Sequence, residues 1–149
     1  MITEIAALIS ALTALAAVII GPLISAKLQR NDRHNELREK WIDELRDTIS
    51  SIISHAESCA AITLQSRELN QELSDKYDFL VQCEGKAKMM LNPSDVNHEN
   101  LYKTITCLVE IVRDEGVANT KKMFQVRDHC ALLTSNAQEV FTAEKKKLK

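Results

Sequence analysis

The stretch "WIDELRDTISSIISHAESCAAITL", residues 41–64, decides the fold. Apolar or small side chains recur in it at alternating spacings of three and four residues, which places them on one face of an α-helix. Ile53, Ala60 and Leu64 widen this face beyond the seam of a two-stranded coiled coil, so we expect the helix to pack inside a bundle. The seam itself consists of Ile42, Leu45, Ile49, Ile52, Ala56, Cys59 and Thr63.

The composition predicts an all-α protein. The 149 residues include 3 glycines, 2 prolines and 4% aromatics, with 45% hydrophobic and 27% charged side chains. So few turn-forming residues beside so many helix formers favour long helices joined by short loops. The net charge of −2 argues against binding a DNA or RNA polymer.

Three more amphipathic stretches follow the first helix, at 67–91, 96–116 and 117–149. Pro93 ends the first of them, Ser94 or Asp95 caps the next, and Gly116 ends that one. Helices joined by loops this short are antiparallel neighbours. The predicted inward positions are Leu69, Leu73, Tyr77, Leu80, Val81, Ala87 and Leu91, then Leu101, Ile105, Leu108, Val109 and Val112, then Val117, Phe124, Leu132, Leu133, Val140 and Phe141.

The N-terminal stretch "EIAALISALTALAAVIIGPLISAK", residues 4–27, has 22 residues without an ionisable side chain between Glu4 and Lys27. Three interpretations compete: a membrane span, a secretory signal, or a buried core helix. Roughly 20 apolar residues cross a bilayer, whereas a signal needs a basic N-terminal region and a shorter apolar core. A core helix would have a polar face. We therefore expect a transmembrane helix at residues 1–27 and a cytosolic antiparallel helical bundle at 28–149.

Charge asymmetry predicts the orientation of this span. No basic side chain precedes it, which places the N-terminus outside and the following domain in the cytoplasm of a bacterial cell with the span in its inner membrane. Four cysteines, one in each predicted helix and none in a CxxC pair, suit reduced cytosolic thiols. The basic residues that follow the span are Lys27, Arg30, Arg33, Arg38, Lys40 and Arg46.

Small residues recur along one side of the span at helical spacing. Such a face lets two helix backbones approach closely, and it predicts self-association into a homo-oligomer. The alternative is that alanine serves here only as a good helix former. The residues concerned are Ala7, Ala11, Ala14, Ala17, Gly21 and Ser25.

Three features bear on the membrane-proximal end of the bundle. Trp41 is the only tryptophan, and we expect it to pack beside Ile42 and Leu45 rather than to anchor at the membrane interface. The antiparallel order returns the C-terminal "EKKKLK", residues 144–149, towards the bilayer. Its lysines either contact anionic headgroups or form a solvated tail. The segment before Leu37 is either a solvated helix or broken at Asn31-Asp32.

No catalytic signature occurs: the chain lacks GxSxG, HExxH, P-loop and GxGxxG motifs. We therefore predict no enzyme, no catalytic residues and no cofactor. His55 and Cys59, four residues apart, suit a zinc site only if Cys83, His129 or Cys130 joins them, and we predict no metal. A cyclic oligonucleotide or another anionic ligand has candidate contacts in Lys121, Lys122, Arg127 and His129, unless these form an ordinary charged surface.

The span, its basic flank and "REKWIDELR", residues 38–46, resemble a loose group of small bacterial membrane proteins. In these, an N-terminal span is followed at once by a helix with an R-x-K-W-I-x-x-L-R pattern. Some proteins of similar layout are membrane effectors of antiviral defence, including a type III CRISPR kind whose cytosolic domain binds cyclic oligoadenylate. The resemblance covers about the first 55 residues. It implies an oligomeric sensor whose ligand signal passes to the span.

The sequence thus favours a membrane-anchored oligomeric effector that senses a nucleotide second messenger and perturbs the inner membrane. The main alternative is a passive scaffold or adaptor that holds a protein partner at the bilayer. A third is a spanin-like phage lysis protein, which needs its domain outside, against the basic flank.

Overall fold

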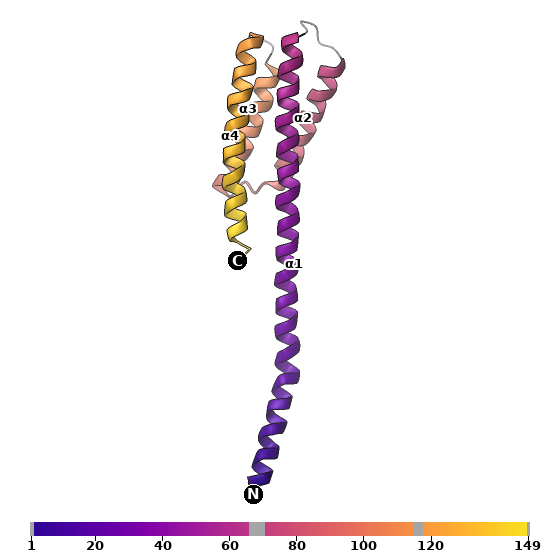
Figure 1. The fold of residues 1–149 in the computed structure, drawn as a ribbon, viewed down its shortest axis with the longest axis vertical. Helices are drawn as coiled ribbons and strands as arrows, with labels where there is room; N and C mark the ends of the chain where they lie inside the picture. Colours follow the sequence, from indigo (N-terminus) through magenta and orange to yellow (C-terminus); the bar gives the residue numbers. More distant parts are fainter. Residues whose placement is uncertain (1, 66–70, 115–117, 149) are drawn as a thin grey trace. The chain divides into compact units, whose positions relative to one another are not determined.

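Every helix of the computed structural model is an α-helix, and no strand occurs among the residues that it describes. These are the backbone of residues 2–65, 71–114 and 118–148 and the side chains of residues 25–64, 71–114 and 118–148. The helices are α1 (Ile2–Gln65), α2 (Gln71–Met90), α3 (Val96–Arg113) and α4 (Asn119–Lys146) (Figure 1). The contacts divide the chain into two units, residues 1–38 and residues 39–149. The second unit is a helical bundle, which confirms the predicted fold class for this part.

Successive helices of the bundle run antiparallel, as predicted (Figure 1). Trp41, near the start of the bundle portion of α1, donates its Nε1–H to the carbonyl of Met90 at the end of α2, at 3.2 Å. At the opposite end, the Asn119 amide at the start of α4 donates to the carbonyl of Thr63, at 2.7 Å. These two side chain–backbone bonds tie α1 to a neighbour at each end.

The seam of residues 42–63 forms the α1 part of the core. All its members are buried except Thr63, whose hydroxyl bonds back to the carbonyl of Cys59. Leu45 and Ile52 are completely inaccessible to solvent. Helix α3 follows its prediction too, because Leu101, Ile105, Leu108, Val109 and Val112 are all buried. Trp41 packs against this core, as expected.

The predicted faces of α2 and α4 were partly wrong. Val81 is 42% exposed, Leu132 is 49% exposed and Phe124 is 60% exposed. On α4 the buried positions follow a strict three-and-four spacing that omits both Phe124 and Leu132, because a hydrophobic residue off the register cannot turn inwards. Leu69 and Val117 lie outside the described residues. The buried positions of α4 are Lys122, Val126, Cys130, Leu133, Ala137, Val140 and Glu144.

Helix ends account for two polar contacts of the bundle. Asp95 caps the N-terminus of α3, as one of the two predicted candidates. That helix ends at Arg113, and the predicted Gly116 cap lies outside the described residues. Lys122 is 4% exposed and its ammonium donates to the carbonyl of Val112 at 3.2 Å. A buried lysine thus satisfies a carbonyl that the end of α3 leaves without a helical partner.

Helix α1 continues through Asn31 and Asp32, which decides between the two alternatives for the segment before Leu37: it is a continuous helix, not a break. Ser25 to His34 are exposed, as expected for a solvated helix. Among the residues whose side chains are described, no helical stretch is long and apolar enough to cross a bilayer. The predicted span at residues 1–27 lies almost wholly outside that set, so it stays a prediction.

Candidate functional site

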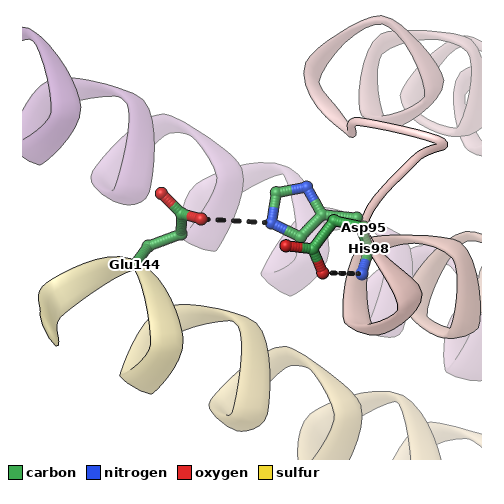
Figure 2. Close-up of side chains that lie close together, drawn as sticks. All are labelled: Asp95, His98 and Glu144. Atoms are coloured by element: carbon green, nitrogen blue, oxygen red, sulfur yellow. Dashed lines mark hydrogen bonds and ion pairs between the residues drawn. The ribbon is translucent and has the colours of Figure 1, made fainter. Parts of the chain in front are cut away.

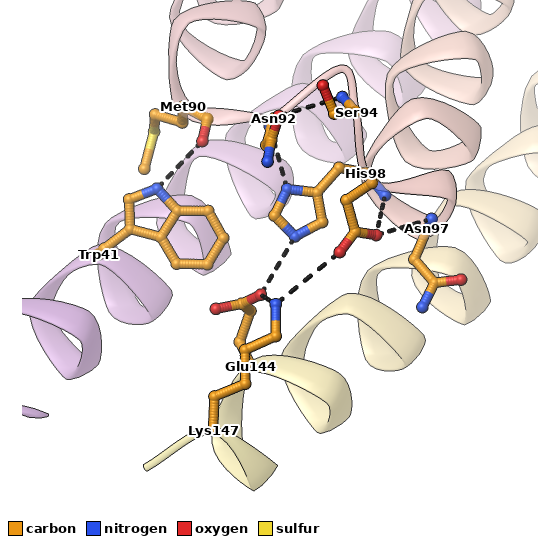
Figure 3. Close-up of polar contacts among 9 residues, drawn as sticks. Trp41, Met90, Asn92, Ser94, Asn97, His98, Glu144 and Lys147 are labelled. Atoms are coloured by element: carbon orange, nitrogen blue, oxygen red, sulfur yellow. Dashed lines mark hydrogen bonds and ion pairs between the residues drawn. The ribbon is translucent and has the colours of Figure 1, made fainter.

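A polar cluster lies at the end of the bundle that contains Trp41, and it starts from the loop between α2 and α3. Pro93 interrupts the helical ladder, and the Asn92 side chain accepts a hydrogen bond from the backbone N–H of Ser94, at 3.0 Å. Asp95 then caps α3: its Oδ1 accepts from the N–H of Asn97 at 3.0 Å and of His98 at 3.4 Å. This turn and cap place His98 in the first turn of α3, facing the loop (Figure 3).

His98 is 6% exposed and has a different contact on each side of its ring. Its Nδ1 accepts a hydrogen bond from the backbone N–H of Asn92, at 3.1 Å. Its ring stacks on the indole of Trp41, with centroids 5.6 Å apart and planes inclined by 12°. Its Nε2 has no hydrogen-bond partner and lies 3.6 Å from Oε1 of Glu144.

These contacts fix the tautomer of the neutral His98 ring. A backbone N–H is only a donor, so Nδ1 must present its lone pair to Asn92. The ring proton therefore sits on Nε2 and points at the Glu144 carboxylate. A second proton on Nδ1 would face the Asn92 N–H and break that bond.

Glu144 brings α4 into the cluster and is 5% exposed. Its Oε1 accepts a hydrogen bond from the ammonium of Lys147, the residue that caps the C-terminus of α4. The same ammonium lies 3.8 Å from Oδ2 of Asp95. Two carboxylates on different helices therefore share one ammonium, which holds the end of α4 against the start of α3.

The environment of Asp95 changes its pKa. Desolvation raises the pKa of this carboxyl, but the hydrogen bonds from Asn97 and His98 favour the carboxylate. The charge of Lys147, and of His98 when it is protonated, acts in the same direction. The net result is a pKa below the ordinary value, so the capping carboxylate resists protonation at a pH where an ordinary aspartate is half protonated.

The cluster also has the composition of a metal site, and this can be tested against its geometry. One ligand atom from each of Asp95, His98 and Glu144 lies within 4.8 Å of the others (Figure 2). A histidine that binds a metal through Nε2 presents a lone pair there and donates its Nδ1–H elsewhere. His98 shows the reverse arrangement, and the Lys147 ammonium already contacts both carboxylates. These residues do not fit a metal ion in this arrangement; they form an internal ion-pair cluster.

The four residues predicted to bind an anion do not converge on one patch. Lys121 and Arg127 are exposed, whereas Lys122 is buried and bonded to Val112. His129 faces Cys107 on α3. Of the four predicted residues, only Lys121 and Arg127 are exposed on the surface, where an anionic ligand could contact them.

The other predicted site residues are the zinc candidates His55 and Cys59 and the small-residue face of the predicted span. His55 donates its Nδ1–H to the carbonyl of Ser51 and stacks on Phe79 at 4.3 Å, while Cys59 lies in the core. In the small-residue face of the span, Ser25 is exposed. The remaining members of that face, Ala7, Ala11, Ala14, Ala17 and Gly21, lie outside the residues with described side chains.

Sequence reasoning missed His98 and Glu144. Glu144 continues the three-and-four spacing of α4 beyond Val140, and an acidic residue at a buried position requires a partner. This spacing, together with a histidine three residues after the Asp95 cap, is the sequence pattern that could have pointed to the two residues. The partner of Glu144 depends on which helix ends lie next to each other in the fold. The spacing of residues along one helix does not predict that arrangement.

Comparisons of this chain with protein-family models, with curated proteins and with solved structures find no match.

Proposed function

We propose that the protein is a membrane-anchored, oligomeric effector that responds to a signal by perturbing the inner membrane. The observation that carries the proposal is the stretch of 22 residues, 5–26, without an ionisable side chain. It belongs to α1, the same helix that supplies the first core seam of the bundle. A uniformly uncharged stretch of this length is typical of a span.

The bundle offers an element on which a signal can act. At the Trp41 end, the contacts of His98 join α1, the α2–α3 loop and α4. A ligand that binds better when these contacts are open would shift the population towards the open arrangement. Lys121 and Arg127 are exposed and remain candidate contacts for an anionic ligand, for which a cyclic oligonucleotide is the probe.

The C-terminal lysines support contact with a membrane surface. Lys145 and Lys146 are exposed, and they follow Glu144, which lies beside His98 and hence at the Trp41 end. This is also the end at which residue 39 begins the bundle unit. Basic residues near an anionic bilayer contribute about 1 kcal/mol each.

The membrane activity is tested by permeability of cells expressing the full chain, measured as uptake of an impermeant dye. Ala17→Leu changes the predicted small-residue face, and Ala16→Leu makes the same substitution on another side of the helix. We expect leakage with the wild type and with Ala16→Leu, and its loss with Ala17→Leu while the protein still sediments with membranes. Equal leakage from both variants would reject a close-packed face. Absence of the chain from the membrane fraction would reject the anchor.

The signal is tested on the protein purified in detergent, by its mass with and without a cyclic oligoadenylate. The proposal expects a change in oligomer size or tighter association with the nucleotide. The double variant Lys121→Ala with Arg127→Ala removes the two candidate contacts on α4. Lys103→Ala, which removes an exposed cation of α3, is the control. A response that all of these variants retain would place the ligand elsewhere.

A scaffold function has one specific observation in its favour. Phe124 and Leu132 are 60% and 49% exposed on α4, and Met123, which precedes Phe124 in the sequence, is 39% exposed. Exposed apolar side chains of this kind suit a protein partner. A scaffold would copurify with one partner, lose it on Phe124→Ser, and cause no dye uptake. That result would replace the effector proposal.

A further inference from the structure

Cys107 on α3 and His129 on α4 form a thiol–imidazole pair across the packed α3–α4 contact. The Cys107 Sγ lies 3.5 Å from Nε2 of His129, and both side chains are part-buried. The other nitrogen of the ring, Nδ1, lies 3.0 Å from the backbone carbonyl of Gln125. The imidazole is thus held between a thiol and a carbonyl.

The carbonyl determines the role of the ring. A carbonyl oxygen only accepts hydrogen bonds, so Nδ1 of His129 carries the proton in the neutral ring. Nε2 then presents its lone pair to the thiol, and Cys107 is the donor. If the thiol proton moves to Nε2, both ring N–H groups keep a partner: the Gln125 carbonyl and the thiolate. The pair therefore accommodates the charged form without losing a hydrogen bond.

The other three thiols lack these conditions. Cys59, Cys83 and Cys130 are buried, with at most 8% of each residue exposed. Desolvation raises the pKa of Cys59 and Cys83, and it raises the pKa of Cys130 to about 11, with a smaller contribution from Glu57. Thiol chemistry requires the thiolate, so burial makes these three cysteines inert. All four cysteines are free.

We propose that Cys107 is a modification site that reacts with low-molecular-weight disulfides, with His129 as the proton acceptor. The Cys107 proton passes to Nε2 of His129, and the sulfur attacks one sulfur of the disulfide. The disulfide S–S bond breaks as the new S–S bond forms. The departing thiolate takes the proton from His129 and leaves as a free thiol. Cys107 is oxidised, the small disulfide is reduced, and protons and electrons balance.

The pair meets the general requirement for an activated nucleophile: a base within reach of the thiol, and a third group that orients the base. The third group is the backbone carbonyl of Gln125, one turn earlier on α4. This inference is independent of the proposed membrane function, because it depends only on contacts within the bundle.

The test uses the full chain in detergent, treated with oxidised glutathione, with the modified cysteine identified by peptide mass spectrometry over time. We expect Cys107 to react first and His129→Gln to slow it at least about tenfold, a modest share of a general base's usual effect. His55→Gln is the matched control, because His55 makes the same backbone hydrogen bond but stacks on Phe79. Circular dichroism checks that each variant remains folded.

Denatured protein separates base catalysis from simple exposure. In guanidinium the four cysteines should react alike, and His129→Gln should match the wild type. The proposal is overturned if Cys107 in the folded wild type is no faster than the other three. It is also overturned if folded His129→Gln reacts as fast as the wild type or faster, since exposure alone would then explain the rate. Cys107→Ser should abolish the fast phase, and a fast phase that persists would assign it to another thiol.

Discussion

Backbone groups assign opposite roles to two histidines of this bundle. His98 accepts from the N–H of Asn92, whereas His129 donates to the carbonyl of Gln125. The first ring therefore points a proton at its neighbour Glu144, and the second points a lone pair at Cys107. The same residue type is thus a donor at one site and a base at the other.

The first prediction concerns these tautomers. Long-range proton–nitrogen NMR spectra of the histidine side chains at neutral pH should show His98 protonated on Nε2 and His129 protonated on Nδ1. His55, bonded to the carbonyl of Ser51, should share the His129 form. Assignments come from His→Gln variants. A His98 ring protonated on Nδ1 would contradict the loop contact and would restore the metal interpretation of the cluster.

The second prediction concerns Asp95 as a cap. Asp95→Ala removes both the charge and the acceptor and should lower the melting temperature at neutral pH, whereas Asp95→Asn keeps an acceptor and should lower it less. Because the folded-state pKa is depressed, the carboxylate stabilises the fold fully above its ordinary pKa of 3.8.

This stabilisation should be lost as the pH falls from that value through the folded-state pKa. The measurement is thermal unfolding of wild type and both variants over a pH series. A gap between wild type and Asp95→Ala that widens on acidification would contradict the assignment.

At the scale of the element, periodicity predicted α1 and α3 well and α4 less well. The α1 seam is regular and its positions are apolar, so pattern and burial agree. In α4, two buried positions are Lys122 and Glu144, and two large apolar residues, Phe124 and Leu132, lie off the register. Hydrophobicity alone therefore assigns the wrong residues to the buried face of α4. Tertiary contacts decide which polar side chains find hydrogen-bond or ion-pair partners in the interior and so can be buried.

The third prediction uses adjacent leucines of α4. Leu133 is completely buried and Leu132 is 49% exposed. Leu133→Ala should reduce the free energy of unfolding by about 2–5 kcal/mol, since it removes packed methyl groups and leaves a cavity. Leu132→Ala, the same chemical change one residue earlier, should cost less than about 1 kcal/mol. Urea denaturation measures both. Similar losses would mean that the register of α4 is wrong.

At the scale of the whole molecule, the sequence predicted four helices in antiparallel order and could not predict the site. The order follows from short loops and amphipathic stretches. The cluster requires the α2–α3 loop and the adjoining start of α3 to meet the end of α4, and His98 and Glu144 are 46 residues apart in the chain. Cys107 and His129 are likewise 22 residues apart on different helices.

The fourth prediction concerns the independence of the bundle. The core cluster begins at Leu45 and ends at Val140, so a fragment of residues 39–149 keeps all of it. This fragment should be helical and unfold in one cooperative transition, followed by circular dichroism during heating. A fragment without a cooperative transition would show that residues 1–38 are needed for folding.

The position of Trp41 also has a spectroscopic consequence. The chain has a single indole, and it is stacked on His98 and bonded to the Met90 carbonyl. Intrinsic fluorescence therefore reports on one end of the bundle without any attached dye. A ligand that opens this end would change the emission, whereas one that binds near Asn119, at the opposite end, would leave it nearly constant. The protein carries its own local probe for the step at which a signal would act.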